Sequence, residues 1–381
     1  MRTHFKRLPV FQCLWILALF IVTSCHVGSN SKPKEREKQQ SLDQFVISYM
    51  KDYQIPGAAY AVVKDGKLIY QGYLGYAHLN YRVPVSDSTL FAIASMDKQV
   101  TASAVMILEE GGLVKTTDQI NVYLDSLPIE WASMTIEHLL THTSGIPDEV
   151  ARTYEDRYLI EYKTEELYEH ICSLKLDFLP GESWSYSDAN FFLLQRIVEE
   201  VSHIPYQQFL EERMFAPLGI EDSRIVEPYD VIQNLAQSYE LDSTGMLLTN
   251  IWRSVSFGPL YNDIGFTLND FVKWELGIQR NELLTASAYE KMWTPVELNN
   301  GSLAEFERMD QDSSNIKSHY GYGWELGNID GHRNIFHGGF AGTSIQRFPE
   351  EQLTVIVFTN LCRGKFIPDH LASSIVVRVG L

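Results

Sequence analysis

Residues 95–98 have the sequence Ser-Met-Asp-Lys and begin a strongly apolar segment of this 381-residue chain. Ser95 and Lys98 are the two members that could take part in a reaction. On a helix, this spacing places the alcohol and the amine on one face, a single turn apart. A serine nucleophile needs such a neighbour, because its hydroxyl reacts only when a base removes the proton. The structural alternative is an N-cap serine followed by a solvated lysine, and the tetrad alone does not separate the two interpretations.

Two further segments place chemically useful residues later in the chain. Tyr186 and Asp188 enclose the sequence Tyr-Ser-Asp, just before an apolar helical segment that begins near Asn190. His337 opens the sequence His-Gly-Gly inside a strand pattern near the C-terminus. The structural alternatives are a core aromatic residue for Tyr186 and a helix cap for Asp188. The order of all three segments is far more specific than the tetrad.

This order resembles the serine beta-lactamase and penicillin-binding-protein superfamily, in particular its class C and esterase-like branch. There, Ser-x-x-Lys is followed by Tyr-x-Asn or a variant, and then by Lys-Thr-Gly or His-x-Gly. The resemblance extends from about residue 42 to the C-terminus and includes non-catalytic sequences at 55–67, 138–148, 217–223, 320–324 and 348–360. It implies an α+β fold of the beta-lactamase/transpeptidase type.

The resemblance also implies a role for each residue in an acyl-enzyme mechanism. Ser95 is the nucleophile, and its own N–H forms the oxyanion hole together with the N–H of Phe340. Lys98 and Tyr186 are the candidate general base and acid. Each perturbs the pKa of the other, so the sequence leaves open which of them takes the proton of Ser95. No cofactor is required.

Two positions depart from the commoner pattern and bear on the substrate. Asp188 stands where Asn is commoner, and an ionised Asp cannot donate a hydrogen bond to a substrate amide. We expect Asp188 to pair with Lys98, to raise the pKa of Lys98 and to favour esters or other acyl substrates over beta-lactams.

His337 replaces a lysine that would bind a substrate carboxylate. Because histidine titrates near about pH 6.5, that attraction should fade as the pH rises through neutrality. Gly338 and Gly339 fit a strand that another backbone approaches closely.

The candidate activities within this class are those of an esterase, a D-alanyl-D-alanine carboxypeptidase or peptidase, and a beta-lactamase. The substrate would be a small-molecule or peptidoglycan-derived acyl compound, and loops such as 250–267 would decide among these. A penicillin-binding-like sensor or binding module that does not turn over is the alternative from another class of protein.

The N-terminus predicts export to the bacterial cell envelope. Basic residues precede an apolar stretch from about 8 to 22, which is shorter than the roughly 20 residues of a membrane span. We expect residues 1–25 to be a lipoprotein signal peptide with lipidation at Cys25, residues 26–40 to be a flexible tether, and residues 41–381 to be one hydrolase domain. The protein would then be anchored in the membrane and face the periplasm or the cell surface. The alternative is an ordinary signal peptide in which Cys25 is incidental.

Charge and the remaining cysteine and histidine residues restrict the partners further. The formal net charge of -18 repels polyanions, so nucleic acid is not an expected partner. His138 and His142 lack the glutamate of a zinc-protease pattern and are interpreted as residues of a turn around 143–145. The sequence leaves open whether Cys172 and Cys362 form a disulfide.

The periodicity of apolar residues predicts strands at both ends of the chain and helices between them. Helices are expected over 42–53, 95–110, 191–201, 206–214 and from 368 onward, and strands over 58–63, 68–73, 334–336, 343–348 and 353–358. This order predicts an antiparallel sheet assembled from both chain ends, flanked by helices, with an inserted helical lobe. The site should lie where the lobe meets the sheet.

Overall fold

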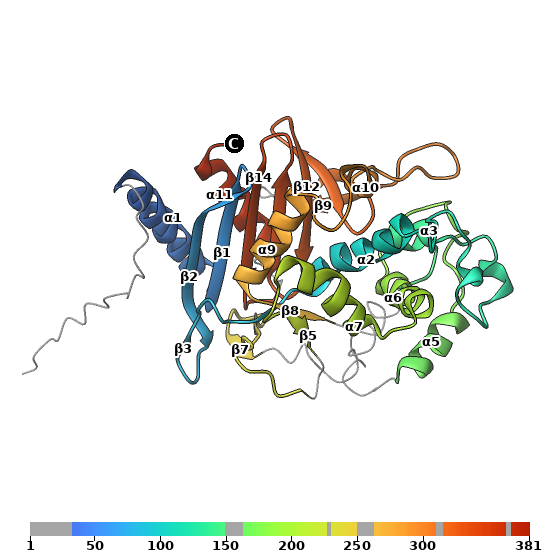
Figure 1. The fold of residues 1–381 in the computed structure, drawn as a ribbon. Coiled ribbons are helices and arrows are strands. Elements are labelled where there is room, and N and C mark those ends of the chain that lie inside the picture. The colour runs from blue at the N-terminus through green and yellow to red at the C-terminus, as the bar shows by residue number, and fades with distance from the viewer. Residues whose placement is uncertain (1–32, 149–162, 227–229, 250–262, 310–314, 363–366) are drawn as a thin grey trace, which may run out of the picture.

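The computed structural model describes residues 33–148, 163–226, 230–249, 263–309, 315–362 and 367–381. Its main feature is an antiparallel sheet in the order β3-β2-β1-β14-β13-β12-β11-β10-β9 (Figure 1). The strands are β1 (Gly57–Lys64), β2 (Lys67–His78), β3 (Val83–Pro84), β9 (Glu305–Met309), β10 (Asn315–Tyr320), β11 (Glu325–Ile329), β12 (His332–Gly339), β13 (Thr343–Phe348) and β14 (Leu353–Thr359). Because β1 pairs with β14, the sheet is assembled from both chain ends, as predicted.

The first hairpin follows directly from its turn sequence. Asp65 and Gly66 connect β1 to β2 with φ angles of 51° and 69°. Positive φ at both central residues matches the right-handed twist of the paired strands, and Asp-Gly adopts it readily. The predicted hairpin is therefore confirmed.

The sheet separates two hydrophobic cores. Successive side chains of β1 point to opposite faces, so Ala59 and Ala61 join the larger core while Ala58 and Tyr60 join the smaller one. Helices α1 (Pro33–Asp52) and α11 (Pro368–Val379) cover the smaller core. Helix α9 (Leu268–Gln279) and the helical lobe cover the opposite face (Figure 1).

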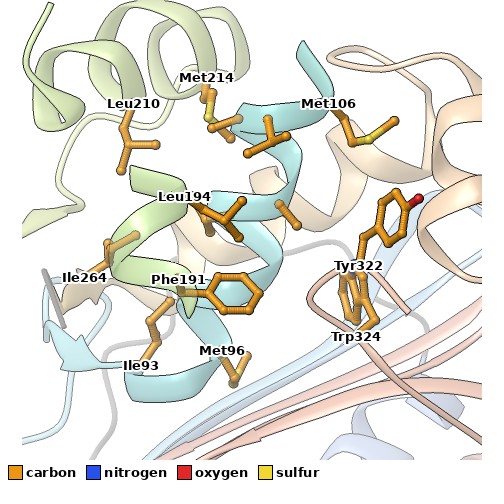
Figure 2. Close-up of a cluster of buried hydrophobic side chains, with 14 of the residues drawn as sticks. Ile93, Met96, Met106, Phe191, Leu194, Leu210, Met214, Ile264, Tyr322 and Trp324 are labelled. Carbon is orange, nitrogen blue, oxygen red and sulfur yellow. The ribbon is translucent and has the colours of Figure 1, made fainter. Parts of the chain in front are cut away.

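The helical lobe lies between the two halves of the sheet in the sequence. Its elements are α2 (Lys98–Glu110), α3 (Ile136–Leu140), α5 (Thr164–Ser173), α6 (Asp188–Ser202), α7 (Tyr206–Leu210) with the following π-helical turn η4 (Glu211–Phe215), and η5 (Ala216–Leu218). A small sheet of β4 (Phe91–Ala92), β8 (Ile264–Phe266) and β5 (Arg224–Ile225) adjoins it, and α10 (Ala286–Met292) packs on α2. Figure 2 shows Phe191 and Leu194 of α6 lying against helix α2. This α2–α6 contact positions the candidate site.

The predicted tether is wrong from Pro33 onward, because α1 begins there rather than near residue 42. Gln39 explains the early start, since its Nε2 donates to Tyr60 Oη at 2.8 Å and to the carbonyl of Gln71 at 2.9 Å. The predicted signal peptide, Cys25 and residues 26–32 lie outside the described residues. Within the part that is described, no helix is long and apolar enough to cross a membrane.

The two cysteines whose pairing the sequence left open are both free. Cys172 is half-buried on α5, and Cys362 is buried after β14. Burial raises the pKa of the Cys362 thiol to about 12, so it remains a neutral thiol at physiological pH.

A buried ion pair joins α9 to the centre of the sheet. The guanidinium of Arg347 on β13 contacts Glu275 Oε2, and the two side chains are 4% and 0% exposed. Thr354 Oγ1 and Gln279 Nε2 each donate to Glu275 Oε1 at 2.7 Å. Both carboxylate oxygens therefore have partners, which a buried charge requires.

Replacing Glu275 with alanine should destabilise the protein strongly. The guanidinium of Arg347 would remain buried without its partner, which typically costs about 3–5 kcal/mol of unfolding free energy. Urea denaturation measures this change. The matched control is Glu282→Ala, because Glu282 pairs with Arg280 on the surface at 3.6 Å and should contribute less than about 1 kcal/mol. Similar losses in both variants would contradict the assignment.

Candidate active site

Ser95 lies in a tight turn where the sheet meets the helical lobe. It belongs to the 3-10 helix η1 (Ala94–Asp97), which continues directly into α2. The preceding residue, Ala94, has a φ of 47°, a strained value for a residue with a side chain, and its N–H donates to Asp263 Oδ1 at 3.0 Å. The predicted helix over 95–110 is thus present, with a 3-10 first turn. Ser95 stands at its N-terminal end, where backbone N–H groups favour negative charge.

Lys98 is buried among acidic and aromatic groups. Its side chain is 3% exposed, and its Nζ lies 2.8 Å from Asp188 Oδ1 and 3.4 Å from Asp97 Oδ1. The same Nζ lies 5.4 Å from the ring centre of Tyr186 and 5.3 Å from that of Phe191. Burial alone would lower the pKa of Lys98, but the charges of Asp188 and Asp97 hold it well above its ordinary value. Lys98 is therefore an ammonium at neutral pH.

Asp188 is the first residue of α6 and not its cap. The N-cap is Ser187, and no side chain donates or accepts a capping hydrogen bond there. The carboxylate of Asp188 instead forms the ion pair with Lys98 across the α2–α6 contact. Of the two interpretations of Asp188, the structure favours the ion pair that raises the pKa of Lys98.

Tyr186 lies near both Lys98 and Ser95. Burial raises the pKa of its phenol, and the ammonium of Lys98 and the hydroxyl of Ser95 only partly oppose that effect. Within the described residues, Tyr186 Oη has no partner with full hydrogen-bond geometry, although Ser95 is near enough to act on its pKa. Ser95, Lys98 and Tyr186 are therefore brought together from two distant segments, as expected.

The end of β12 lies against the backbone that precedes Ser95. A Cβ atom on Gly339 would lie 2.2 Å from the carbonyl oxygen of Ile93, and one on Gly338 would lie 3.0 Å from Asp369 Oδ2. Thr343 Oγ1 donates to the same carbonyl of Ile93 at 2.9 Å. The predicted close approach of another backbone is confirmed at Gly339, whereas Gly338 faces the carboxylate of Asp369. The contact at Gly339 places the turn that carries Phe340 next to the turn that carries Ser95.

His337 does not have the protonation behaviour that the sequence predicted. It is 1% exposed, its Nδ1 donates to the carbonyl of Gly338 at 3.0 Å, and its Nε2 accepts from Tyr320 Oη at 2.9 Å. Burial, followed by the charge of Lys98, lowers the pKa of His337 to about 4. The imidazole is neutral throughout pH 6–8, so the expected loss of an attraction to carboxylates over that range is wrong.

His142 and His138 act as structural residues of the turn around 143–145. His142 is buried beneath Tyr186 with ring centres 4.3 Å apart, and its Nδ1 accepts from the N–H of Ser187 at 3.2 Å. The Nδ1 of His138 accepts from the N–H of Thr135 at 3.1 Å in a capping box. Within the described ranges, no group of three His, Cys, Asp or Glu side chains could hold a metal ion.

Some residues of the site were missed by the sequence analysis. Asp97 is a buried carboxylate inside the tetrad, and its charge in an apolar segment was a signal that could have been used. Burial raises the pKa of Asp97 to about 7, although Lys98 opposes this effect.

Three aromatic residues from three segments, here called the aromatic wall, were also missed by the sequence analysis: Trp184, Phe306 and Tyr320. Trp184 stacks on Phe306 with ring centres 4.5 Å apart, and its ring centre lies 5.9 Å from that of Tyr320.

Comparison with known proteins identifies the protein family to which this fold and this arrangement of residues belong. Residues 42–370 match the family described as Beta-lactamase, so the chain belongs to the beta-lactamase family. It is 26% identical to penicillin-binding protein 4* of Bacillus subtilis (strain 168) over 347 residues. The aligned region covers 86% of this chain and 72% of that protein. It is 25% identical to protein flp of Staphylococcus aureus (strain MW2), with 89% and 67% covered.

Solved structures agree with this assignment. The octameric penicillin-binding protein homologue from Pyrococcus abyssi superimposes with a TM-score of 0.76 at 24% identity, covering 90% of this chain and 77% of that one. The penicillin binding protein from Bacillus halodurans gives a TM-score of 0.71 at 25% identity, covering 87% and 98%. The predicted α+β fold of the beta-lactamase/transpeptidase type is confirmed. The class C branch and the lipoprotein signal remain predictions.

Replacing Asp188 with asparagine should lower the pKa of Lys98. The substitution removes the carboxylate that lies 2.8 Å from the ammonium and leaves the desolvation of Lys98 in place. Titration of the Nζ resonance of Lys98 by NMR measures the change. The matched control is Asp118→Asn, because Asp118 is bound by the hydroxyl of Tyr123 on the surface. An unchanged Lys98 pKa in Asp188→Asn would show that the ion pair does not control its protonation.

Proposed function

We propose that this protein is a serine hydrolase that cleaves an acyl bond through a covalent intermediate on Ser95. The observation that carries the proposal is the convergence of Ser95, Lys98 and Tyr186 at the junction of the lobe and the sheet. Ser95 Oγ would attack the substrate carbonyl carbon, lose its proton and expel the leaving group. Water would then cleave the ester formed on Ser95 and release the acid.

The resting protonation states define the route of the proton. Lys98 is an ammonium and Tyr186 a neutral phenol, so neither is a free base at neutral pH. Lys98 would act as a base only after passing its proton to the paired carboxylate of Asp188, a transfer that works against the ion pair that stabilises the resting ammonium. The resulting amine would accept the proton of Ser95, directly or through the hydroxyl of Tyr186, and return it to the leaving group. Lys98, Tyr186 and Asp188 would therefore act as one coupled proton-transfer unit.

The oxyanion would be stabilised by backbone N–H groups. The N–H of Ser95 lies at the N-terminal end of a helical segment, where the helix dipole favours negative charge. The N–H of Phe340 would be the second donor, and the packing of Gly339 on Ile93 supports this assignment because it fixes the two turns against each other. Removing one such donor typically costs about 100-fold to 1000-fold in rate.

Esters are the favoured substrates within this class. The carboxylate of Asp188 is held by Lys98 and cannot donate a hydrogen bond to an amide carbonyl. The second candidate activity is that of a D-alanyl-D-alanine carboxypeptidase or a beta-lactamase, which the names of the penicillin-binding relatives support. A sensor or binding module with the same pocket would react with acyl compounds but would not turn over.

We also propose that the protein is anchored in the bacterial cell envelope through a lipid on Cys25. The basic, apolar and small residues before Cys25 support this location. Because α1 begins at Pro33, only residues 26–32 separate the anchor from the folded part, and they reach about 25 Å at full extension. The domain would therefore lie close to the membrane surface.

Ser95→Ala should abolish both covalent labelling and turnover. Mass spectrometry after incubation with a fluorophosphonate should find one adduct on Ser95 in the wild type and none in the variant. A panel of p-nitrophenyl esters, D-amino-acid peptides and nitrocefin then ranks the activities, and we expect faster turnover of the esters than of nitrocefin. Labelling without turnover of any compound would support the binding module. The absence of an adduct would refute the proposal that Ser95 is the nucleophile.

Gly339→Ala should lower the rate of fluorophosphonate labelling at least about 100-fold, because the added methyl group displaces β12 from the Ser95 turn. The matched control is Gly327→Ala on the neighbouring strand β11, where the nearest atom to the new Cβ is a ring carbon of Phe336 at 3.3 Å. Circular dichroism checks that both variants fold. Equal labelling rates in the two variants would show that the packing of Gly339 on Ile93 does not contribute to the reaction at Ser95.

A further inference from the structure

We propose that this site selects acyl substrates that carry no carboxylate beside the scissile bond. Neutral esters would be accepted, whereas compounds with a carboxylate at that place, such as beta-lactams and peptide C-termini, would be disfavoured. The inference rests on the proposed function, because it names the substrate class of the same Ser95 site. Three features of the described residues carry it.

The charged groups beside Ser95 are mainly acidic. Asp97 and Asp188 both contact Lys98, and the three side chains are 6%, 12% and 3% exposed. When both acids are ionised, the group has two negative charges and one positive charge. A substrate carboxylate placed here would face two carboxylates with little water to screen the repulsion. The ammonium of Lys98 already has two acidic partners, so it offers weak attraction to a third carboxylate.

His337 provides no replacement cation. It occupies the place where a lysine would bind a substrate carboxylate in the related pattern, yet both of its ring nitrogens are used within the protein. Its Nε2 accepts a hydrogen bond from Tyr320, so that nitrogen carries no proton to donate to a carboxylate. A carboxylate could bind there only if the buried Tyr320 contact broke.

The aromatic wall offers apolar surface on the same side of the site. Trp184 and Phe306 are both partly exposed, and their stacked rings lie beside Tyr320. The wall is continuous with Tyr186 through the ring of His142, which lies 4.3 Å from Tyr186 and 4.8 Å from Tyr320 between ring centres. Aromatic faces bind uncharged, apolar groups well and bind carboxylates poorly. Acidic charge, a neutral histidine and aromatic surface all favour an uncharged substrate.

A pair of matched esters tests this selectivity. Both are phenyl esters of phenylacetylglycine, and the leaving phenol carries either a 3-carboxylate or a 3-carboxamide. Their kcat/KM values are measured at pH 7.5 and divided by the rates of hydroxide-catalysed hydrolysis. We expect the neutral ester to be favoured at least tenfold in the full-length protein. A ratio of one or less, with turnover of both esters, would overturn the proposed selectivity and leave the hydrolase intact.

Variants of the site separate charge from shape. His337→Lys should raise the relative kcat/KM of the anionic ester at least fivefold, whereas the neutral control His337→Gln should not. Asp97→Asn should change the ratio in the same direction as His337→Lys, because it removes one negative charge. Each ratio is measured within one preparation, so a partly folded variant does not distort it. Ratios that stay at the wild-type value in both His337→Lys and Asp97→Asn would refute the electrostatic cause. Absence of Ser95-dependent turnover of either ester would instead refute the hydrolase itself.

Discussion

The buried ion pair between Lys98 and Asp188 is the interaction on which the rest of the site depends. It joins the first residue of α2 to the first residue of α6, and its Nζ–Oδ1 distance is 2.8 Å. A buried ammonium without a carboxylate would lose its proton or destabilise the fold. The packing of Phe191 and Leu194 between the two helices maintains the distance (Figure 2). The hydrophobic core of the lobe therefore holds Asp188 beside Lys98, and the charges of Asp188 and Asp97 keep Lys98 protonated against its burial.

The second constraint is the close approach of β12 to the turn that carries Ser95. A side chain at Gly339 would collide with the carbonyl of Ile93, so glycine there allows the sheet to reach the lobe. The strained φ of Ala94 and its hydrogen bond to Asp263 fix the same turn from the other side. Catalysis would then rely on backbone groups held by the fold rather than on mobile side chains.

Much of this arrangement could be predicted from the sequence, because the information is local. Hydrophobic periodicity predicted both terminal strand pairs and the helices between them, and the Asp-Gly turn predicted the first hairpin. The spacing of Ser95 and Lys98 predicted that both lie on one helical face. The early start of α1 could not be predicted, because it depends on contacts of Gln39 with the distant Tyr60 and Gln71.

By itself, the sequence determined which groups are available: an alcohol, an amine, a phenol, a carboxylate and an imidazole in a fixed order, on elements whose type follows from local patterns. The tertiary structure decided their protonation. Lys98 stays charged, His337 stays neutral and Asp97 joins the site, because burial and neighbouring charges from other segments set the pKa of each group. These effects depend on distances between residues far apart in the chain, which only the folded protein defines.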